Sequence, residues 1–168
     1  MKKLILTMCV ALIVLIVFSC GNKTVKPLPA VVDSWVEISG TYSNLPMEIR
    51  LNKGLAPIVA NPHLSYQIGI SVPLHDPLDN GLPDSSEREQ LKILEKQVVS
   101  AFAEKNETYF AIVVITNSTA EFIFYTNSEK IIREKFKKTQ QQITGYQLKL
   151  NTLKDPHWGV YKQFSKSF

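Results

Sequence analysis

The first twenty residues constrain the fold more than any other segment, because they decide how many cysteines the folded domain can use. Lys2 and Lys3 precede an apolar run over residues 4–18 that only Thr7 interrupts. A membrane-spanning helix needs about 20 apolar residues, and this run has about 15. A short positive start followed by a short apolar core is typical of a secretory signal. We therefore expect residues 1–19, including Cys9, to be removed as a signal peptide.

The end of the apolar run, Val17-Phe18-Ser19-Cys20, resembles the lipobox of bacterial lipoproteins. The resemblance implies attachment of diacylglycerol to the Cys20 sulfur, cleavage before Cys20, and acylation (for example with palmitate) of the new amino group. Two or more buried acyl chains hold a protein stably at a membrane. The alternative is an ordinary cleaved signal followed by a chance cysteine.

Residues 20–32 then form a lipidated tether, which is polar and contains Pro27 and Pro29. Gly21 and Asn22 lack the aspartate that is commonly read as an inner-membrane retention signal. We expect the protein in the cell envelope, and the periplasmic side of the outer membrane is favoured if the cell is Gram-negative.

The remaining residues, 33–168, are expected to form one domain that folds around a hydrophobic core. Cys20 is the only cysteine after the signal, so no disulfide can form within the chain. A domain of this size can bury enough surface without one. Two of the 19 Lys and Arg residues leave with the signal, so 17 remain against 15 Asp and Glu. This near balance predicts no nucleic-acid partner, since such a partner requires a clustered basic face.

The hydrophobic periods predict an α+β fold. Residues 64–73 alternate apolar and polar side chains, the pattern of a strand with one buried face. Ser86 and Glu89 have the spacing of a capping box at the start of a helix. The expected order is a hairpin at 35–42 and 46–52, a strand at 64–73, a helix from 86, strands at 109–116 and 121–126, a helix from 127 or 128 to 143, and a strand at 146–150. After the hairpin, this is the ferredoxin-like order βαββαβ, which predicts an antiparallel sheet with two helices on one face.

Several short motifs together resemble a bacterial family known as the domain of unknown function 695. They are Trp35, Asn80-Gly81-Leu82-Pro83, Leu91, Leu94-Glu95, Phe124-Tyr125, Asp155-Pro156-His157-Trp158 and Tyr161, and they cover residues 33–162. The family often has a glycine in the hairpin near residues 118–120, and this chain has none there. The resemblance implies no activity, because the family has none assigned.

Glu95 is the most informative single residue. A helical projection puts it inside the apolar stripe of the first helix, about 40° from Leu91. A carboxylate that points at a sheet costs free energy unless it is paired or neutral. One interpretation is a binding or acid–base group. The other is a structural carboxylate bonded to a nearby Tyr, Trp or backbone amide, or one that extends to solvent at the helix edge.

Trp158 and Tyr161 lie three residues apart after Asp155-Pro156, so on a helical turn they share a face. One interpretation is a C-terminal clasp in which both rings pack over the sheet. The other is an aromatic anchor for a partner, since Trp and Tyr dominate interface hot spots. Gly81 can adopt a positive φ and is expected to shape the loop before the first helix.

The sequence contains no recognisable catalytic motif, so the leading hypothesis is a non-enzymatic binding domain with an envelope protein as a possible partner. No cofactor or metal is expected. The alternative is a hydrolase or metal-dependent enzyme that uses Glu95 or the His and Asp residues of two loops. The form of that enzyme that uses the loop residues requires His75 and Asp79 to meet Asp155 and His157 in space.

Overall fold

The computed structural model describes residues 28–166, so the signal, Cys20 and the first part of the tether lie outside the described residues. Within that range, no helix is long and apolar enough to span a membrane. The elements are β1 (Trp35–Tyr42), β2 (Leu45–Asn52), the 3₁₀ helix η1 (Lys53–Ile58), β3 (Tyr66–Pro73), α1 (Ser85–Phe102), β4 (Thr108–Thr116), β5 (Thr119–Thr126), α2 (Glu129–Gln142), β6 (Lys149–Lys154) and α3 (Gly159–Ser165).

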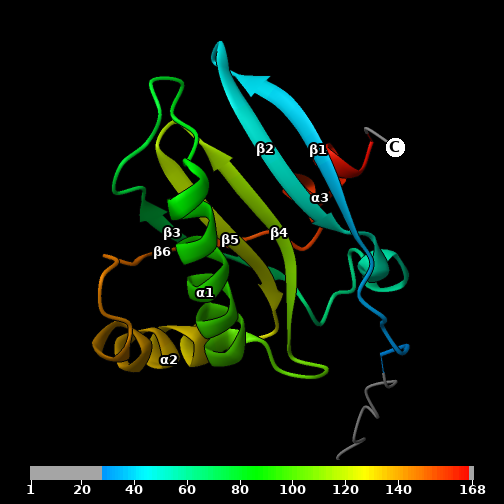
Figure 1. The fold of residues 1–168 in the computed structure, drawn as a ribbon. Helices are drawn as coiled ribbons and strands as arrows, with labels where there is room; N and C mark the ends of the chain where they lie inside the picture. The colour runs from blue at the N-terminus through cyan, green and yellow to red at the C-terminus, as the bar shows by residue number, and fades with distance from the viewer. Residues whose placement is uncertain (1–27, 167–168) are drawn as a thin grey trace, which may run out of the picture.

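The six strands form one sheet in the order β1-β2-β4-β5-β3-β6 (Figure 1). Every neighbouring pair is antiparallel. The mixed α+β class is confirmed, but the ferredoxin-like topology is not matched, because the sheet has six strands and not four. The hairpin β1–β2 joins the sheet where Met47–Leu51 pair with Ile112–Thr116. This pairing covers the outer edge of β4, which would otherwise expose unsatisfied backbone groups.

Helices cover both faces of the sheet. On the face that carries α1 and α2, the core includes Ile68, Val98, Phe102, Phe122, Phe124 and Ile132. On the opposite face, η1 and α3 pack on a second core that includes Leu51, Leu55, Ile112, Ile123 and Trp158. Figure 1 shows α1 and α2 on the near side of the sheet and α3 behind it. The two helices expected on one face are therefore there, and α3 adds a layer to the other face.

Two-residue turns close the hairpins β1–β2 and β4–β5. Ser43 and Asn44 have φ values of 50° and 66°, and Asn117 and Ser118 have values of 47° and 58°. Two successive positive φ values are the mark of a type I′ turn, whose twist matches that of the flanking strands. In the second hairpin, Asn and Ser therefore adopt the backbone conformation for which the family often has glycine.

Most expected strand and helix boundaries differ from the structure by one to four residues, and two of these differences have a visible cause. The α1 helix begins at Ser85, because the Asp84 carboxylate accepts the Glu87 N–H at 2.8 Å and caps the helix upstream of the expected Ser86–Glu89 box. The last strand runs over Lys149–Lys154 and not over 146–150. The Tyr146 ring instead stacks on His75, with centroids 4.3 Å apart, and this contact holds residue 146 outside the sheet.

Candidate functional site

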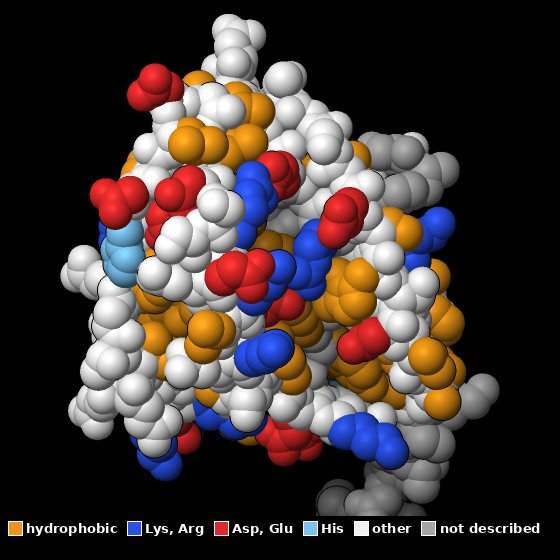
Figure 2. Space-filling model, in the orientation of Figure 1, with side chains coloured by type: hydrophobic (Ala, Val, Ile, Leu, Met, Phe, Trp, Pro, Cys, Tyr) orange, Lys and Arg blue, Asp and Glu red, His pale blue; other side chains and the backbone are white. Residues whose placement is uncertain are grey.

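A cleft of about 310 Å³ lies between α1 and the β1–β2 hairpin. The α1 helix packs over the middle of the sheet, while the hairpin extends the sheet past it (Figure 1). The space between them has an apolar floor that includes Val113, Ile115, Ala120 and Phe122. Figure 2 shows apolar surface in this hollow, surrounded by acidic and basic side chains. The volume is at the lower end of the range for small-ligand sites.

Two bidentate ion pairs connect the cleft walls. Arg50 of β2 donates to both Glu95 carboxylate oxygens, at 2.8 and 3.1 Å. Arg88 of α1 donates to both oxygens of Glu48 on β2, at 2.8 Å for the longer bond. Arg88 and Glu95 are two helical turns apart on one face of α1, and Glu48 and Arg50 are two residues apart on one face of β2. The hydrogen bond to Glu48 raises the pKa of the Arg88 guanidinium.

Glu95 therefore has a partner that sequence reasoning did not consider. The structural interpretation names a Tyr, a Trp or a backbone amide as the partner, whereas the structure pairs Glu95 with an arginine 45 residues away in the chain. The Glu95 side chain retains 19% of its exposure and that of Arg50 retains 34%. The pair is thus accessible from the cleft, and Glu95 lies in its wall. This position is compatible with a binding role and with a structural one.

Trp35 lies next to the same ion pair. Its ring packs against Phe110 with centroids 4.9 Å apart, and the Arg50 guanidinium carbon lies 5.1 Å from the Trp35 ring centroid. A guanidinium over an indole ring gains a cation–π attraction. The half-buried Trp35 therefore helps to hold Arg50 in the orientation that meets Glu95.

Three of the other aromatic landmarks, Tyr125, Trp158 and Tyr161, lie on the opposite face of the sheet. Trp158 is fully buried (0% exposed), and its ring stacks on Tyr125 with centroids 3.8 Å apart. Its indole N–H donates to the Leu64 carbonyl at 2.8 Å. Trp158 has a φ of 56°, an unfavourable backbone conformation that the packing of its ring must offset.

Asp155 and Tyr161 complete this arrangement, which we call the clasp and define as Tyr125, Asp155, Trp158 and Tyr161. Asp155 accepts the Tyr125 hydroxyl at 3.0 Å and the Gly159 N–H at 2.9 Å, and the Tyr161 hydroxyl donates to the Asn52 carbonyl at 2.8 Å. Burial, and then the Asp155 charge, raise the pKa of Tyr125. Because three of the four side chains are buried, the clasp fastens α3 to the sheet and exposes no aromatic anchor.

Gly81 serves the packing of the loop before α1. It has a φ of 78°, and its carbonyl accepts the Ser118 N–H at 2.9 Å. A Cβ at this position would lie 3.1 Å from the Ser118 nitrogen. A side chain at residue 81 would therefore be strained by the positive φ and would crowd the β4–β5 turn on which the loop docks.

The structure does not bring the His and Asp residues of the two loops together. His75 and Asp79 follow the Pro73 end of β3, whereas Lys154, directly before Asp155, pairs with Tyr66 at the other end. The eight residues of β3 separate these ends by about 23 Å. Within residues 28–166, no group of three or more His, Cys, Asp or Glu could hold a metal ion. The hypothesis that requires all four residues in one site is wrong in its geometry.

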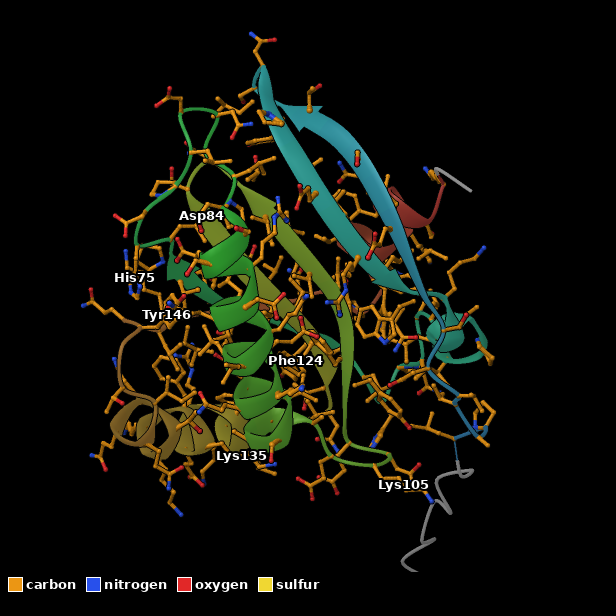
Figure 3. The ribbon with its side chains drawn as sticks, viewed as in Figure 1. His75, Asp84, Lys105, Phe124, Lys135 and Tyr146 are labelled. Carbon is orange, nitrogen blue, oxygen red and sulfur yellow. The ribbon has the colours of Figure 1, made fainter. Side chains whose placement is uncertain are left out.

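Sequence reasoning missed a buried carboxylate near His75. Glu87, 4% exposed, accepts the backbone N–H groups of His75 at 2.8 Å and Asp76 at 3.1 Å, and the Tyr146 hydroxyl at 3.2 Å. Figure 3 shows His75 and Tyr146 side by side next to the start of α1. Burial, followed by the Glu87 charge, raises the pKa of Tyr146 to about 12. The signal that could have identified Glu87 is its spacing of three residues from Asp84.

Sequence reasoning also missed Glu48, Arg50 and Arg88 of the cleft. The sequence does contain a pattern that points to Glu48 and Arg50, because they alternate with the apolar Ile49 and Leu51 in an expected strand. Charged residues on the covered face of a strand need partners. The partner helix, however, cannot be read from a strand pattern.

Comparison with known proteins agrees with the motifs described above. Residues 33–165 match the model of a protein family described as a family of unknown function, DUF695. No curated protein and no solved structure matches the chain. The family match covers most of the sequence, and the chain therefore belongs to the family of unknown function DUF695.

Proposed function

We propose that this protein is a lipid-anchored lipoprotein of the cell envelope whose domain binds a partner protein, without catalysis, in the cleft between α1 and the β1–β2 hairpin. Cys20 carries the lipid in this proposal. The domain then faces the periplasm from the outer membrane if the cell is Gram-negative.

The observation that carries the proposal is the composition of the cleft. Its floor is apolar, and four charged side chains at its rim already satisfy one another in two pairs, Arg50–Glu95 and Arg88–Glu48. Protein interfaces have the same layout, with an apolar centre inside a polar rim. A partner can bury apolar side chains on this floor without separating either of these two ion pairs.

One observation favours the enzyme alternative, since Glu95 lies in the cleft wall. Its bidentate pairing with Arg50 supports a positioning role more than an acid–base role, because both carboxylate oxygens accept hydrogen bonds from a cation. Glu95→Gln separates the two interpretations. We expect partner binding to persist in this variant with only modest weakening, because the amide oxygen can still accept a bond from Arg50.

The binding site is tested by site-specific photo-crosslinking in cells. Lys92 lines the cleft, and its neighbour Ile93 is exposed on α1 outside the cleft lining. We expect a photoreactive residue at position 92 to capture a discrete protein that the same residue at position 93 does not. Capture of the same proteins from both positions would contradict the proposal, and so would no capture from position 92.

The anchor is tested separately. We expect Cys20→Ser to release the protein from the membrane fraction, and mass spectrometry of the native protein to find acyl chains on residue 20. A Cys20→Ser protein that still sediments with membranes would disprove the lipid anchor and leave the cleft proposal standing.

A further inference from the structure

We propose that the partner binds as an extended segment that adds a seventh strand to the sheet alongside β1 and places alternate side chains over the cleft. This inference rests on the proposed function, since it names the kind of partner that the cleft accepts. Two independent features of β1 support it: the backbone groups at its free edge, and the charges beside it.

The outer edge of β1 has backbone N–H and C=O groups that can pair with a further strand. It lies at the end of the strand order, and its eight residues pair with β2 in continuous register without a bulge. Tyr42 and Leu45 flank the two-residue turn and therefore form the closing hydrogen-bonded pair. Along an antiparallel pair such residues alternate, so the amides of Trp35, Glu37, Ser39 and Thr41 point away from β2. Among residues 28–166, no segment pairs with that outer edge.

The side chains at these positions lie on the cleft face. Glu37 and Ser39 line the cleft, and in the β1–β2 register they stand opposite Arg50 and Glu48. A strand that pairs with β1 would project every second side chain toward the same face, because side chains alternate along a strand. Main-chain hydrogen bonds would then supply affinity, and the cleft would select side chains.

The two edges of the sheet differ in how well they are protected against pairing with a further strand. The other edge strand, β6, is shorter and carries Lys149 and Lys154 at its ends. Its Thr152 also takes part in hydrogen bonds with Arg133 and Glu129 of α2. Lysines and covering side chains are common devices against pairing at an edge. β1 has neither lysine nor proline, and its one charged residue is Glu37.

Glu37 indicates the charge of the partner segment. It is exposed, and within the described part of the chain it has no ion-pair partner, whereas Glu48 and Glu95 are paired with arginines. A cationic residue directly opposite Glu37 in a new strand would gain a cross-strand ion pair. The segment we infer therefore alternates basic and apolar residues. The basic side chains stand on the cleft face beside Glu37, and the apolar ones lie on the opposite face, where Val36 and Ile38 of β1 pack against the second core.

The test measures binding of a defined peptide to the full chain, purified in detergent, by fluorescence anisotropy. The probe is an acetylated, fluorescein-labelled peptide in which lysine alternates with valine, and a matched peptide has proline in place of valine. Ser39→Pro removes one outward amide and no β1–β2 ladder bond. Ser39→Ala keeps that amide and is the control. Lys92→Trp obstructs the cleft, and Ile93→Trp is its control.

We expect the lysine–valine peptide to bind and the proline peptide not to bind. Ser39→Pro and Lys92→Trp should each weaken binding about tenfold, while both controls match the wild type. Glu37→Lys should shift the preference to a glutamate–valine peptide. Thermal melting of every variant checks that the fold is retained.

The remaining outcomes overturn the inference in distinguishable ways. If Lys92→Trp weakens binding and Ser39→Pro does not, the cleft is the site and strand addition is wrong, so the proposed function survives. If neither substitution weakens binding, or the peptide does not bind at all, strand addition at β1 is wrong. The crosslinking experiment then tests separately whether a partner binds in the cleft. If the protein dimerises and Ser39→Pro abolishes the dimer, the occupant of β1 is a second copy of the chain and not a partner segment.

Discussion

The two faces of the sheet contain similar numbers of distinctive residues but use them differently. On the clasp face, aromatic side chains are buried, stacked and hydrogen-bonded to the backbone of distant segments. On the cleft face, charged side chains connect α1 to β2 and retain contact with solvent. The comparison teaches that conspicuous residues need not mark a site. Here Trp158 and Tyr161 maintain the fold, and the less conspicuous charges surround the space where a partner can bind.

The difference predicts that substitutions on the clasp face change stability and those on the cleft face change binding. The largest expected effect is that of Trp158→Ala. Removing a fully buried indole that stacks on Tyr125 should lower the free energy of unfolding by about 3–5 kcal/mol. Urea denaturation measures this loss. A loss below about 1 kcal/mol would contradict the role of the clasp.

Tyr125→Phe should have the next largest effect. The hydroxyl donates to Asp155, so its removal leaves a part-buried carboxylate with one bond fewer and should cost about 1–3 kcal/mol at neutral pH. Urea denaturation at neutral pH measures this cost, and the peptide affinity of the cleft should not change.

The same tyrosine predicts a pH dependence with a definite sign. The folded-state pKa of Tyr125 is raised, so its contribution is fully present below the ordinary tyrosine pKa of about 10 and is lost as the pH rises above that value. The wild type should therefore lose stability above about pH 10, and Tyr125→Phe should lose less. Tyr42→Phe is the control, because Tyr42 is exposed. An equal loss in all three proteins would contradict the assignment.

The Arg50–Glu95 pair should contribute about 1 kcal/mol to stability, because it is bidentate and partly shielded. A double-mutant cycle with Arg50→Met and Glu95→Leu measures the coupling. We expect the double variant to be about as stable as the wild type but to bind the peptide differently. A coupling near zero would mean that the pair does not fix the cleft walls.

The Arg88–Glu48 pair should contribute least, about 0.5 kcal/mol, because both side chains are more exposed. The cycle with Arg88→Met and Glu48→Leu should give a coupling that falls as salt is added. If this coupling exceeded that of Arg50–Glu95, the ranking by burial would be wrong.

Local patterns predicted much of the fold. The alternation of residues 64–73 indicated β3, and the apolar stripe with Leu91, Leu94 and Val98 indicated α1, because each period reports which side of one element is buried. The family motifs also identified the residues of the clasp, and the three-residue spacing of Trp158 and Tyr161 gave a clasp as one of two interpretations, the one that the buried rings confirm. Predictions were weaker at boundaries, as at the start of α1, because Asp84 and Ser86 are both good caps and the helix can use only one.

By itself, the sequence determined the class of the fold, the order of its six strands and two longer helices, and the residues that must find partners, such as Glu95. Only the tertiary structure decided which partners they found. Whether the hairpin lies apart or extends the sheet, and whether Glu95 meets a tyrosine or Arg50, depends on contacts between segments far apart in the chain. A periodic pattern carries information about one element and its solvent exposure. Which other element packs against it depends on the packing of the whole domain.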